Sequence, residues 1–405
     1  MSHLTKKRLE IDMLFSIALM MIIGFLLSGI FNRLKLPGLL GMIITGIILG
    51  PYVLDLIASD LLNISKDLRE IALIVILIRA GLSLDLRDLK KVGRPAILMC
   101  FVPATIEILT VVFLAPIIFN ISYIEAAIMG TVLAAVSPAV VVPRMIKLIE
   151  SGHGKDKSIP QLILAGASVD DIYVIILFTA FMGMYKGAAF DSKSLITVPI
   201  SIILGLFVGI IVGLVLVYIF KKVHMRDTVK VFIILSLSFL IVSLETYIQD
   251  YVPMSGLLGV MALGGTILET YGLLARRIIG KFSKIWVGAE LLLFILVGAA
   301  VDIRYLAHAG IGSVAIILLA LLGRIIAVNI SLLKTPLNMK ERFFCSIAYM
   351  PKATVQAAIG AIPLTAGVAS GNLILTIAVL SIMITAPIGA IGIDRLHPRL
   401  LNKIT

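Results

Sequence analysis

Two adjacent aspartates, Asp170 and Asp171, lie in the middle of the apolar run 160–185. At a rise of about 1.5 Å per residue, a helix would place them ~15 Å into the ~30 Å hydrocarbon core of a bilayer. A carboxylate at that depth costs roughly 2.5–3.5 kcal/mol even on the lenient insertion scale. Such residues mark ion pathways or proton relays, so this pair is the first candidate for a functional site.

The two carboxylates are expected to differ in role. Successive residues on a helix are about 100° apart, so the two side chains point in different directions. One can bind an ion in a water-filled cavity while its neighbour orients it, pairs with a donor or holds a proton. When two carboxylates lie this close in a poorly solvated site, ionising both costs much free energy because the two negative charges repel each other. A carboxylate also binds a hard cation only when it is deprotonated, so a cation and a proton would compete.

Competition of this kind exchanges a cation for a proton if the site opens alternately to each side of a membrane. No Walker-type phosphate loop occurs in the sequence, which fits a carrier driven by an ion gradient. We therefore expect a transporter rather than an enzyme, and no cofactor.

The composition indicates a membrane protein. Of the 405 residues, 60% are hydrophobic and 14% are charged, and the mean hydropathy is +1.13. These values exclude a soluble protein of ordinary composition. Hydropathy predicts an all-α polytopic membrane protein with thirteen spans, at 12–31, 36–55, 68–84, 95–118, 123–145, 160–185, 195–220, 229–248, 252–270, 283–302, 310–333, 342–365 and 373–394.

The 35 Lys and Arg residues are unevenly distributed among the loops. Most of them follow odd-numbered spans, which predicts that these loops and the C-terminus face the cytoplasm and that the N-terminus lies outside. Orientation in the membrane explains the net charge of +12 better than a nucleic acid partner does. We expect a multi-pass protein of the cell (plasma) membrane.

The sequence of the chain resembles itself at an offset of about 217 residues. This offset equals seven spans, and because seven is an odd number, the second copy would lie in the membrane in the opposite orientation to the first. The Gly-Leu-Leu-Gly run at 38–41 returns at 256–259, and Glu107 is matched by Arg324. Inverted repeats of this kind are typical of secondary transporters, whose binding site lies at the repeat interface near the midplane.

Each repeat is also predicted to contain one broken helix. Proline within a helix removes a hydrogen bond, and unwound backbone offers carbonyl groups to an ion. An ordinary proline kink is the alternative, which the symmetric placement disfavours. The residues at the two breaks are Ser137 and Pro138 in span 123–145, and Pro351, Lys352 and Thr354 in span 342–365. We expect Lys352 to neutralise carbonyl ends at its break rather than to carry protons.

Glu107 and Arg324 reach similar depths, ~18 Å and ~14 Å from the cytoplasmic side by helix rise. Each would be costly unpaired, so we predict an ion pair that braces the two repeats, with Arg324 near the aspartates. The alternatives are that Arg324 snorkels to the interface or that Glu107 is protonated. Arg79 is expected to snorkel or to pair with Asp85. Four hydroxyl residues are candidate weak cation ligands, although such residues also serve ordinary helix packing: Thr131, Ser137, Ser168 and Thr354.

Several motifs together closely resemble the NHA branch of the monovalent cation:proton antiporters, which includes mitochondrial sodium/hydrogen exchanger-like proteins and bacterial relatives. They are the runs at 79–82, 103–107, 137–143, 166–172 and 351–358. The resemblance covers nearly the whole chain. It implies that Asp171 is the carboxylate that binds the cation and the proton, that Asp170 is its partner, and that Glu107 and Arg324 are the charge pair of this branch.

The resemblance further implies the NhaA-type fold with two crossed, broken helices, and a homodimer. Core helices at 95–185 and 310–394 would move against scaffold and dimer helices at 12–84 and 229–302, with 195–220 as the linker. Bacterial electrogenic members have a lysine at this position, whereas this chain has Arg324. An arginine cannot release a proton at physiological pH. Whether the exchange moves net charge is therefore open.

We expect a Na⁺(Li⁺)/H⁺ antiporter that works by alternating access in the lipid bilayer. A sodium-coupled carrier of an organic anion and a K⁺/H⁺ antiporter are the alternatives of the same fold. An intramembrane aspartyl protease needs aspartates that face each other from different helices, whereas these two are neighbours on one helix. A passive channel would give currents too fast for alternating access.

Overall fold

The computed structural model describes residues 12–83, 93–186, 192–248, 252 and 254–403. The described part is helical, and each of the thirteen predicted spans contains one to three helices. The helices are α1 (Met13–Arg33), α2 (Leu39–Leu49), α3 (Ser59–Asn63), α4 (Ser65–Ser83), α6 (Arg94–Phe119), α7 (Tyr123–Ala134), α8 (Pro138–Ser151), α9 (Ile159–Lys186), α10 (Ser192–Lys222), α11 (Asp227–Ile248), α12 (Gly256–Thr270), α13 (Gly272–Ala299), α14 (Ile303–Ser331), α15 (Met339–Ala348), α16 (Thr354–Ile359), α17 (Ile362–Thr365) and α18 (Gly371–Leu400).

Among the described residues, nine helical segments are long and apolar enough to cross a bilayer, the interrupted segment Tyr123–Ile149 included. The other predicted spans are shorter or more polar. The predicted span 36–55, for example, is helical only as far as Leu49, because Gly50 and Pro51 end the helix. The chain is a multi-pass membrane protein. The nine segments do not confirm the prediction of thirteen full spans, which stays a prediction.

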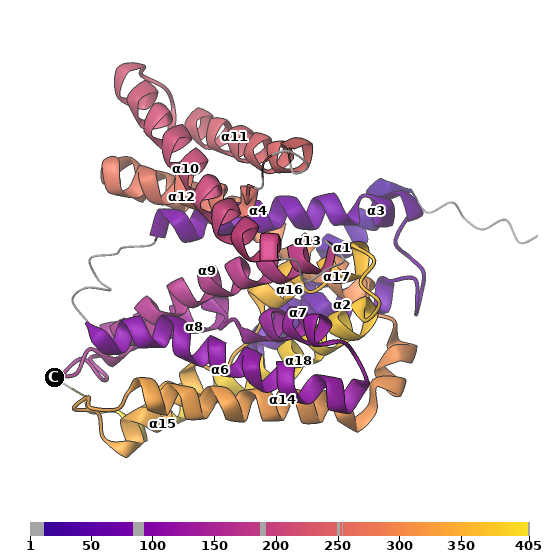
Figure 1. Ribbon diagram of the computed structural model, residues 1–405, viewed down its shortest axis with the longest axis vertical. Coiled ribbons are helices and arrows are strands. Elements are labelled where there is room, and N and C mark those ends of the chain that lie inside the picture. Colours follow the sequence, from indigo (N-terminus) through magenta and orange to yellow (C-terminus); the bar gives the residue numbers. More distant parts are fainter. Residues whose placement is uncertain (1–11, 84–92, 187–191, 249–251, 253, 404–405) are drawn as a thin grey trace, which may run out of the picture.

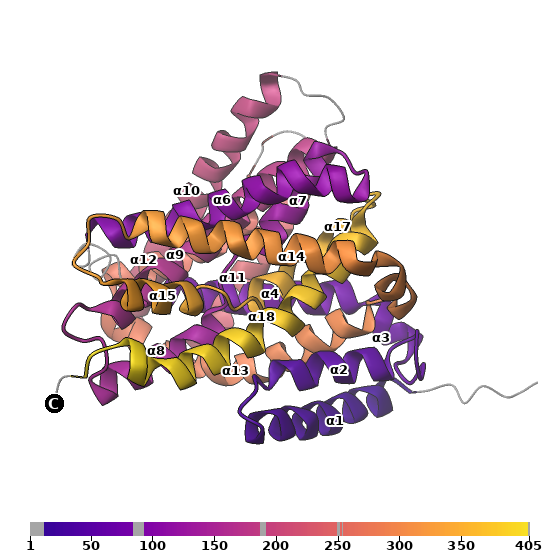
Figure 2. The ribbon, with the colours of Figure 1, turned by 90° about the horizontal axis from the view of Figure 1, so that it is seen from below.

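Two groups of helices lie toward opposite ends of the long axis. Figure 1 shows α4, α10, α11 and α12 at one end of the long axis, and α6, α14 and α15 at the other. Figure 2 shows α1 and α2 side by side along one edge, where α2 packs on α13. Helices α9 and α16 lie between the two groups (Figure 1).

Glycines bring two pairs of helices into close backbone contact. A Cβ atom on Gly46 of α2 would lie 1.9 Å from the carbonyl oxygen of Ile295 on α13, and one on Gly298 would lie 2.2 Å from the carbonyl oxygen of Ile43. The contact between α4 and α12 is built in the same way. There, a Cβ on Gly81 would lie 2.3 Å from the Met261 carbonyl oxygen, and one on Gly264 would lie 2.9 Å from that of Ile78.

These two contacts are reciprocal in the sequence. Gly46 and Gly264 are separated by about seven spans, as are Gly81 and Gly298. The helix pair α2 and α13 therefore uses the same small residues as the pair α12 and α4, with the roles of the two halves of the chain exchanged.

The close approach of α2 and α13 leads to a stability prediction. We expect Gly298→Ala to lower the free energy of unfolding by about 1–3 kcal/mol, because the new methyl group collides with backbone that cannot rotate away. Gly288→Ala is a matched control on the same helix, since a Cβ there meets nothing within 4 Å. Thermal unfolding in detergent, followed by the fluorescence of Trp286, measures both. Equal midpoints for the two variants would contradict the packing argument.

Candidate functional site

Two helices are interrupted, and the two interruptions contact each other. Residues 135–137 separate α7 from α8, and residues 349–353 separate α15 from α16. The Ser137 backbone N–H donates to the Pro351 carbonyl oxygen at 2.8 Å. The side-chain amide of Gln356 donates to the carbonyl oxygens of Ala135 at 2.9 Å and Leu133 at 3.2 Å. Backbone groups that lose their helical partners at one break thus gain partners at the other.

Proline explains where both breaks occur. Pro138 is the first residue of α8, a position where its missing N–H is not needed. Pro351 lies inside the second break, where its carbonyl group is the acceptor for Ser137. The predicted positions of the interruptions therefore agree with the structure.

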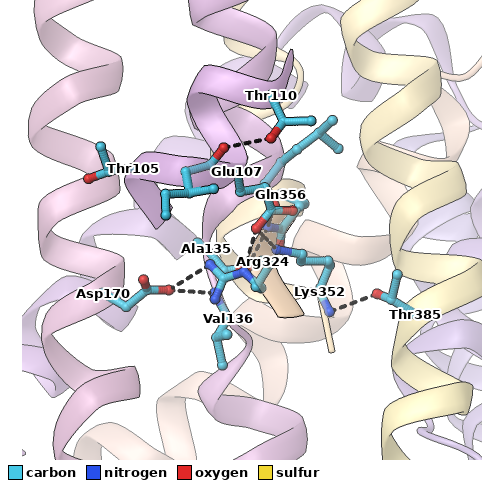
Figure 3. A network of polar contacts seen from close by, with 12 residues as sticks. Thr105, Glu107, Thr110, Ala135, Val136, Asp170, Arg324, Lys352, Gln356 and Thr385 are labelled. Carbon is cyan, nitrogen blue, oxygen red and sulfur yellow. Dashed lines mark hydrogen bonds and ion pairs between the residues drawn. The ribbon is translucent and has the colours of Figure 1, made fainter. Parts of the chain in front are cut away.

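Asp170 is fully buried on α9 and is already hydrogen-bonded at one oxygen. Its Oδ2 accepts from the Val136 backbone N–H at 2.9 Å and from Arg324 Nη2 at 3.2 Å (Figure 3). Asp170 therefore fixes the unwound segment between α7 and α8 and holds one end of the Arg324 guanidinium group.

Glu107 on α6 contacts two basic side chains through the same oxygen. Arg324 Nε donates to Glu107 Oε2, so the predicted contact between these residues is present. Lys352 Nζ lies 2.7 Å from that oxygen. The ammonium group of Lys352 is thus paired with a full carboxylate charge, which attracts it more strongly than a helix end does. Neutralisation of helix carbonyl ends by Lys352 stays a prediction. The backbone N–H of Lys352 donates to Thr385 Oγ1 at 2.9 Å.

Asp171 lines a small cavity instead of joining this network. The space open to a water-sized sphere is about 20 Å³, enough for about one water molecule. Within the described part of the chain, Asp171 Oδ1 and Thr354 Oγ1 have no hydrogen-bond partner. The lining residues come from α4, α9, α12 and α16: Leu73, Ile76, Leu77, Ala80, Asp171, Ile172, Ile175, Met261, Thr354, Val355 and Ala358.

The chemistry of this cavity is that of hard oxygen atoms in an apolar wall. A carboxylate and a hydroxyl oxygen suit a small monovalent cation, and the same carboxylate binds a proton. Of the two aspartates, only Asp171 faces this space, while Asp170 is engaged with backbone and guanidinium groups.

The remaining predicted ligands are placed differently. Ser137 Oγ is fully buried at the first break and finds no hydrogen-bond partner among the described residues. The Thr131 hydroxyl donates to the carbonyl oxygen of Ile128 on its own helix, as packing threonines do. The side chain of Ser168 lies outside the described residues.

A second pair of opposite charges lies between α4 and α13, and sequence reasoning missed one member of it. Arg79 lies close enough to Glu290 for electrostatic attraction, and its guanidinium carbon is 5.6 Å from the centre of the Trp286 ring. The predicted partner Asp85 lies outside the described residues. The signal for Glu290 was available, since it is an acidic residue inside the predicted span 283–302.

The sequence and the structure both resemble those of known transporters. The family described as "Sodium/hydrogen exchanger, transmembrane" matches residues 16–397. Sodium/hydrogen exchanger 9B2 of Homo sapiens is 35% identical over 391 residues, which cover 91% of this chain and 70% of that protein. Sodium/hydrogen exchanger 9B1 of Macaca fascicularis is 33% identical over 390 residues, with 91% and 74% covered.

A solved structure has the same fold. The sodium proton antiporter MjNhaP1 from Methanocaldococcus jannaschii at pH 8 superimposes with a TM-score of 0.81, covering 95% of this chain and 97% of that one. The sequences are 20% identical in this comparison, so the likeness concerns the fold.

Proposed function

Because the chain belongs to the sodium/hydrogen exchanger family, we propose that it is a secondary active antiporter that exchanges Na⁺ or Li⁺ for H⁺ by alternating access. In this proposal the cation and the proton compete for the carboxylate of Asp171. Asp170 is the fixed partner that shapes the site, and Glu107 and Arg324 brace it.

One observation carries the assignment of the site. Asp171 is the carboxylate that faces the cavity, where its Oδ1 and the hydroxyl oxygen of Thr354 lack partners among the described residues. Asp170, in contrast, already has two hydrogen-bond donors on one oxygen. A cation in the cavity would gain oxygen ligands from Asp171 and Thr354 without breaking an existing bond.

We propose that the cavity lies between two bodies that move against each other. Helices α9 and α16 on one side belong to the core formed by 95–185 and 310–394. Helices α4 and α12 on the other side belong to the scaffold formed by 12–84 and 229–302, and 195–220 links the two. Relative motion of core and scaffold would expose Asp171 to one side of the membrane and then to the other.

The proposed architecture is the NhaA-type fold with two inverted repeats of about thirteen membrane helices in total. The reciprocal glycine contacts of α2 with α13 and of α12 with α4 support the repeat. The hydrogen bonds between the two interrupted helices support a crossing of these helices at the site. We further propose a homodimer in the cell membrane, with the N-terminus outside and the C-terminus in the cytoplasm.

The exchange itself is tested in proteoliposomes that contain a pH-sensitive dye. We expect an outward proton movement when Na⁺ or Li⁺ is added outside acid-loaded vesicles, and none with choline. A response to K⁺ alone would replace the proposal by K⁺/H⁺ exchange. A response that requires an added organic anion would replace it by symport. Repeating the assay with a potassium/valinomycin clamp shows whether net charge moves.

A further inference from the structure

One uncharged side chain joins the two helix interruptions. Gln356 on α16 is fully buried. Its amide nitrogen donates to the carbonyl oxygens of Leu133 and Ala135 at the first break, and Figure 3 shows it close to that segment. Its Oε1 accepts from the Ala353 backbone N–H at 2.8 Å, which belongs to the second break. A single amide group therefore satisfies backbone groups of both breaks.

Helix α16 depends on these hydrogen bonds for its orientation. It has only 6 residues, Thr354–Ile359, which are too few to form a stable helix alone. Ala353, the residue before it, has no side-chain oxygen that could cap the helix. Gln356 instead reaches back from the first turn to the Ala353 backbone N–H, as the third residue of a capping box does. The bonds of Gln356 thus fix the rotation of α16 about its axis.

The opposite face of α16 forms part of the wall of the ion cavity. Residues 354 and 356 are about 200° apart on a helix, so Thr354 and Gln356 point to opposite sides. Thr354, Val355 and Ala358 line the cavity together with Asp171. The Thr354 hydroxyl group has no hydrogen-bond partner among the described residues that would hold it there. Rotation of α16 would therefore move this oxygen away from the carboxylate.

We propose that Gln356 is a positioning residue of the ion site: by holding α16 against the first break, it keeps the Thr354 hydroxyl oxygen beside Asp171 and thereby sets the affinity for the cation. The inference rests on the proposed antiport and deepens it. Removal of a group that only holds the ligands of a metal ion in place typically weakens ion binding by roughly 10–100-fold. Because Gln356 carries no charge, its removal leaves the charge balance of the site unchanged.

The test is a double-mutant cycle on the Na⁺ concentration that gives half-maximal proton exchange in proteoliposomes at fixed pH. Met is nearly as long as Gln but has no amide, so we expect Gln356→Met to raise this concentration by about tenfold or more. The maximal rate should stay nearly unchanged, since saturating Na⁺ compensates for weaker binding. Thr354→Val, which removes only the hydroxyl group, should act in the same direction. The variant with both substitutions should be no weaker than Thr354→Val alone, because Gln356 acts through the Thr354 oxygen.

A matched control removes an amide from another contact between helices. Asn329 on α14 donates to Ser346 Oγ on α15 at 3.1 Å and to the Ile325 carbonyl oxygen of its own helix, and neither bond reaches a break. Asn329→Leu should lower the thermal unfolding midpoint but leave the half-maximal Na⁺ concentration unchanged.

Hydrogen exchange followed by mass spectrometry tests the structural step separately. In Gln356→Met, exchange should become faster in peptides that cover 133–138, although the substituted residue lies on α16. Asn329→Leu should not change exchange in these peptides. Unchanged exchange at 133–138 in Gln356→Met would show that Gln356 does not join the two breaks.

Three transport results would overturn the inference while the wild type still exchanges Na⁺ for H⁺. They are an unchanged half-maximal Na⁺ concentration in Gln356→Met, additive effects of the two substitutions, and an equal shift in Asn329→Leu. Absence of exchange by the wild type would instead refute the proposed function, and hydrogen exchange would still test the link between the breaks. If Gln356→Met does not fold, Gln356→Asn replaces it in the cycle, because its amide is one carbon too short to reach both breaks.

Discussion

Asp171→Asn is expected to fold and to lose cation-dependent proton exchange completely. The amide has almost the same shape as the carboxylate, but it neither binds and releases a proton in the working pH range nor offers a negative charge to a cation. No hydrogen bond to Oδ1 is lost within the described residues. The measurement is the proteoliposome assay with Na⁺ and Li⁺, in which the variant should not differ from empty vesicles.

Two companion measurements make this prediction specific to Asp171. Addition of Na⁺ should raise the thermal unfolding midpoint of the wild type but not that of the variant, because a ligand stabilises only the state that binds it. Asp170→Asn should lower the midpoint even without Na⁺, since it weakens the contact with Arg324. Exchange at the wild-type rate by Asp171→Asn would show that the cavity is not the ion site.

Glu107→Gln is expected to destabilise the protein by about 3–5 kcal/mol, the usual effect of removing one partner from a buried ion pair. Both Arg324 and Lys352 contact the same oxygen of Glu107, and all three side chains are almost completely buried. The neutral amide leaves an excess positive charge in a region of low dielectric constant. Chemical denaturation in mixed micelles, followed by Trp286 fluorescence, gives the change in free energy of unfolding.

A second substitution separates the effect of charge from that of shape. Glu107→Gln combined with Lys352→Met restores electrical balance, so we expect the double variant to be more stable than the sum of the two single changes predicts. The ion pair of Arg144 with Asp394 is the surface control, since 41% of the Asp394 side chain is exposed. Asp394→Asn should change stability by less than about 1 kcal/mol. A similar effect of Asp394→Asn and Glu107→Gln would contradict the argument.

Local chemistry in the sequence was enough to predict the two helix interruptions and the contact between Glu107 and Arg324. Proline in the middle of an apolar run removes a helix hydrogen bond and breaks or kinks the helix, so Pro138 and Pro351 predicted the two interruptions. The similar depths of Glu107 and Arg324 predicted their contact, because neither charge is stable alone in a membrane. The angle between successive helix residues also required different surroundings for Asp170 and Asp171.

The sequence could not give what depends on packing between distant helices. Which aspartate faces the cavity is decided by the rotation of α9 relative to α4 and α16, and no residue on α9 encodes that rotation alone. Lys352 lies 245 residues from Glu107, and its contact depends on the path of the chain through the second break. Glu290 has no proline break and no matching charge at the repeat offset to single it out, although its place inside the predicted span 283–302 marks it as costly to bury.

The charges around the two breaks have a consequence for leakage. Asp170 and Glu107 carry two negative charges that Arg324 and Lys352 balance, so the electrical state of the site depends on the occupant of Asp171. In the proposed exchange by alternating access, a proton or a monovalent cation on Asp171 would leave the moving body neutral. With Asp171 empty, that body would carry one uncompensated charge, which at roughly 2.5–3.5 kcal/mol would make its passage about a hundred times rarer. We therefore expect electrostatics to keep an unloaded carrier in place and to suppress dissipation of the ion gradient without exchange.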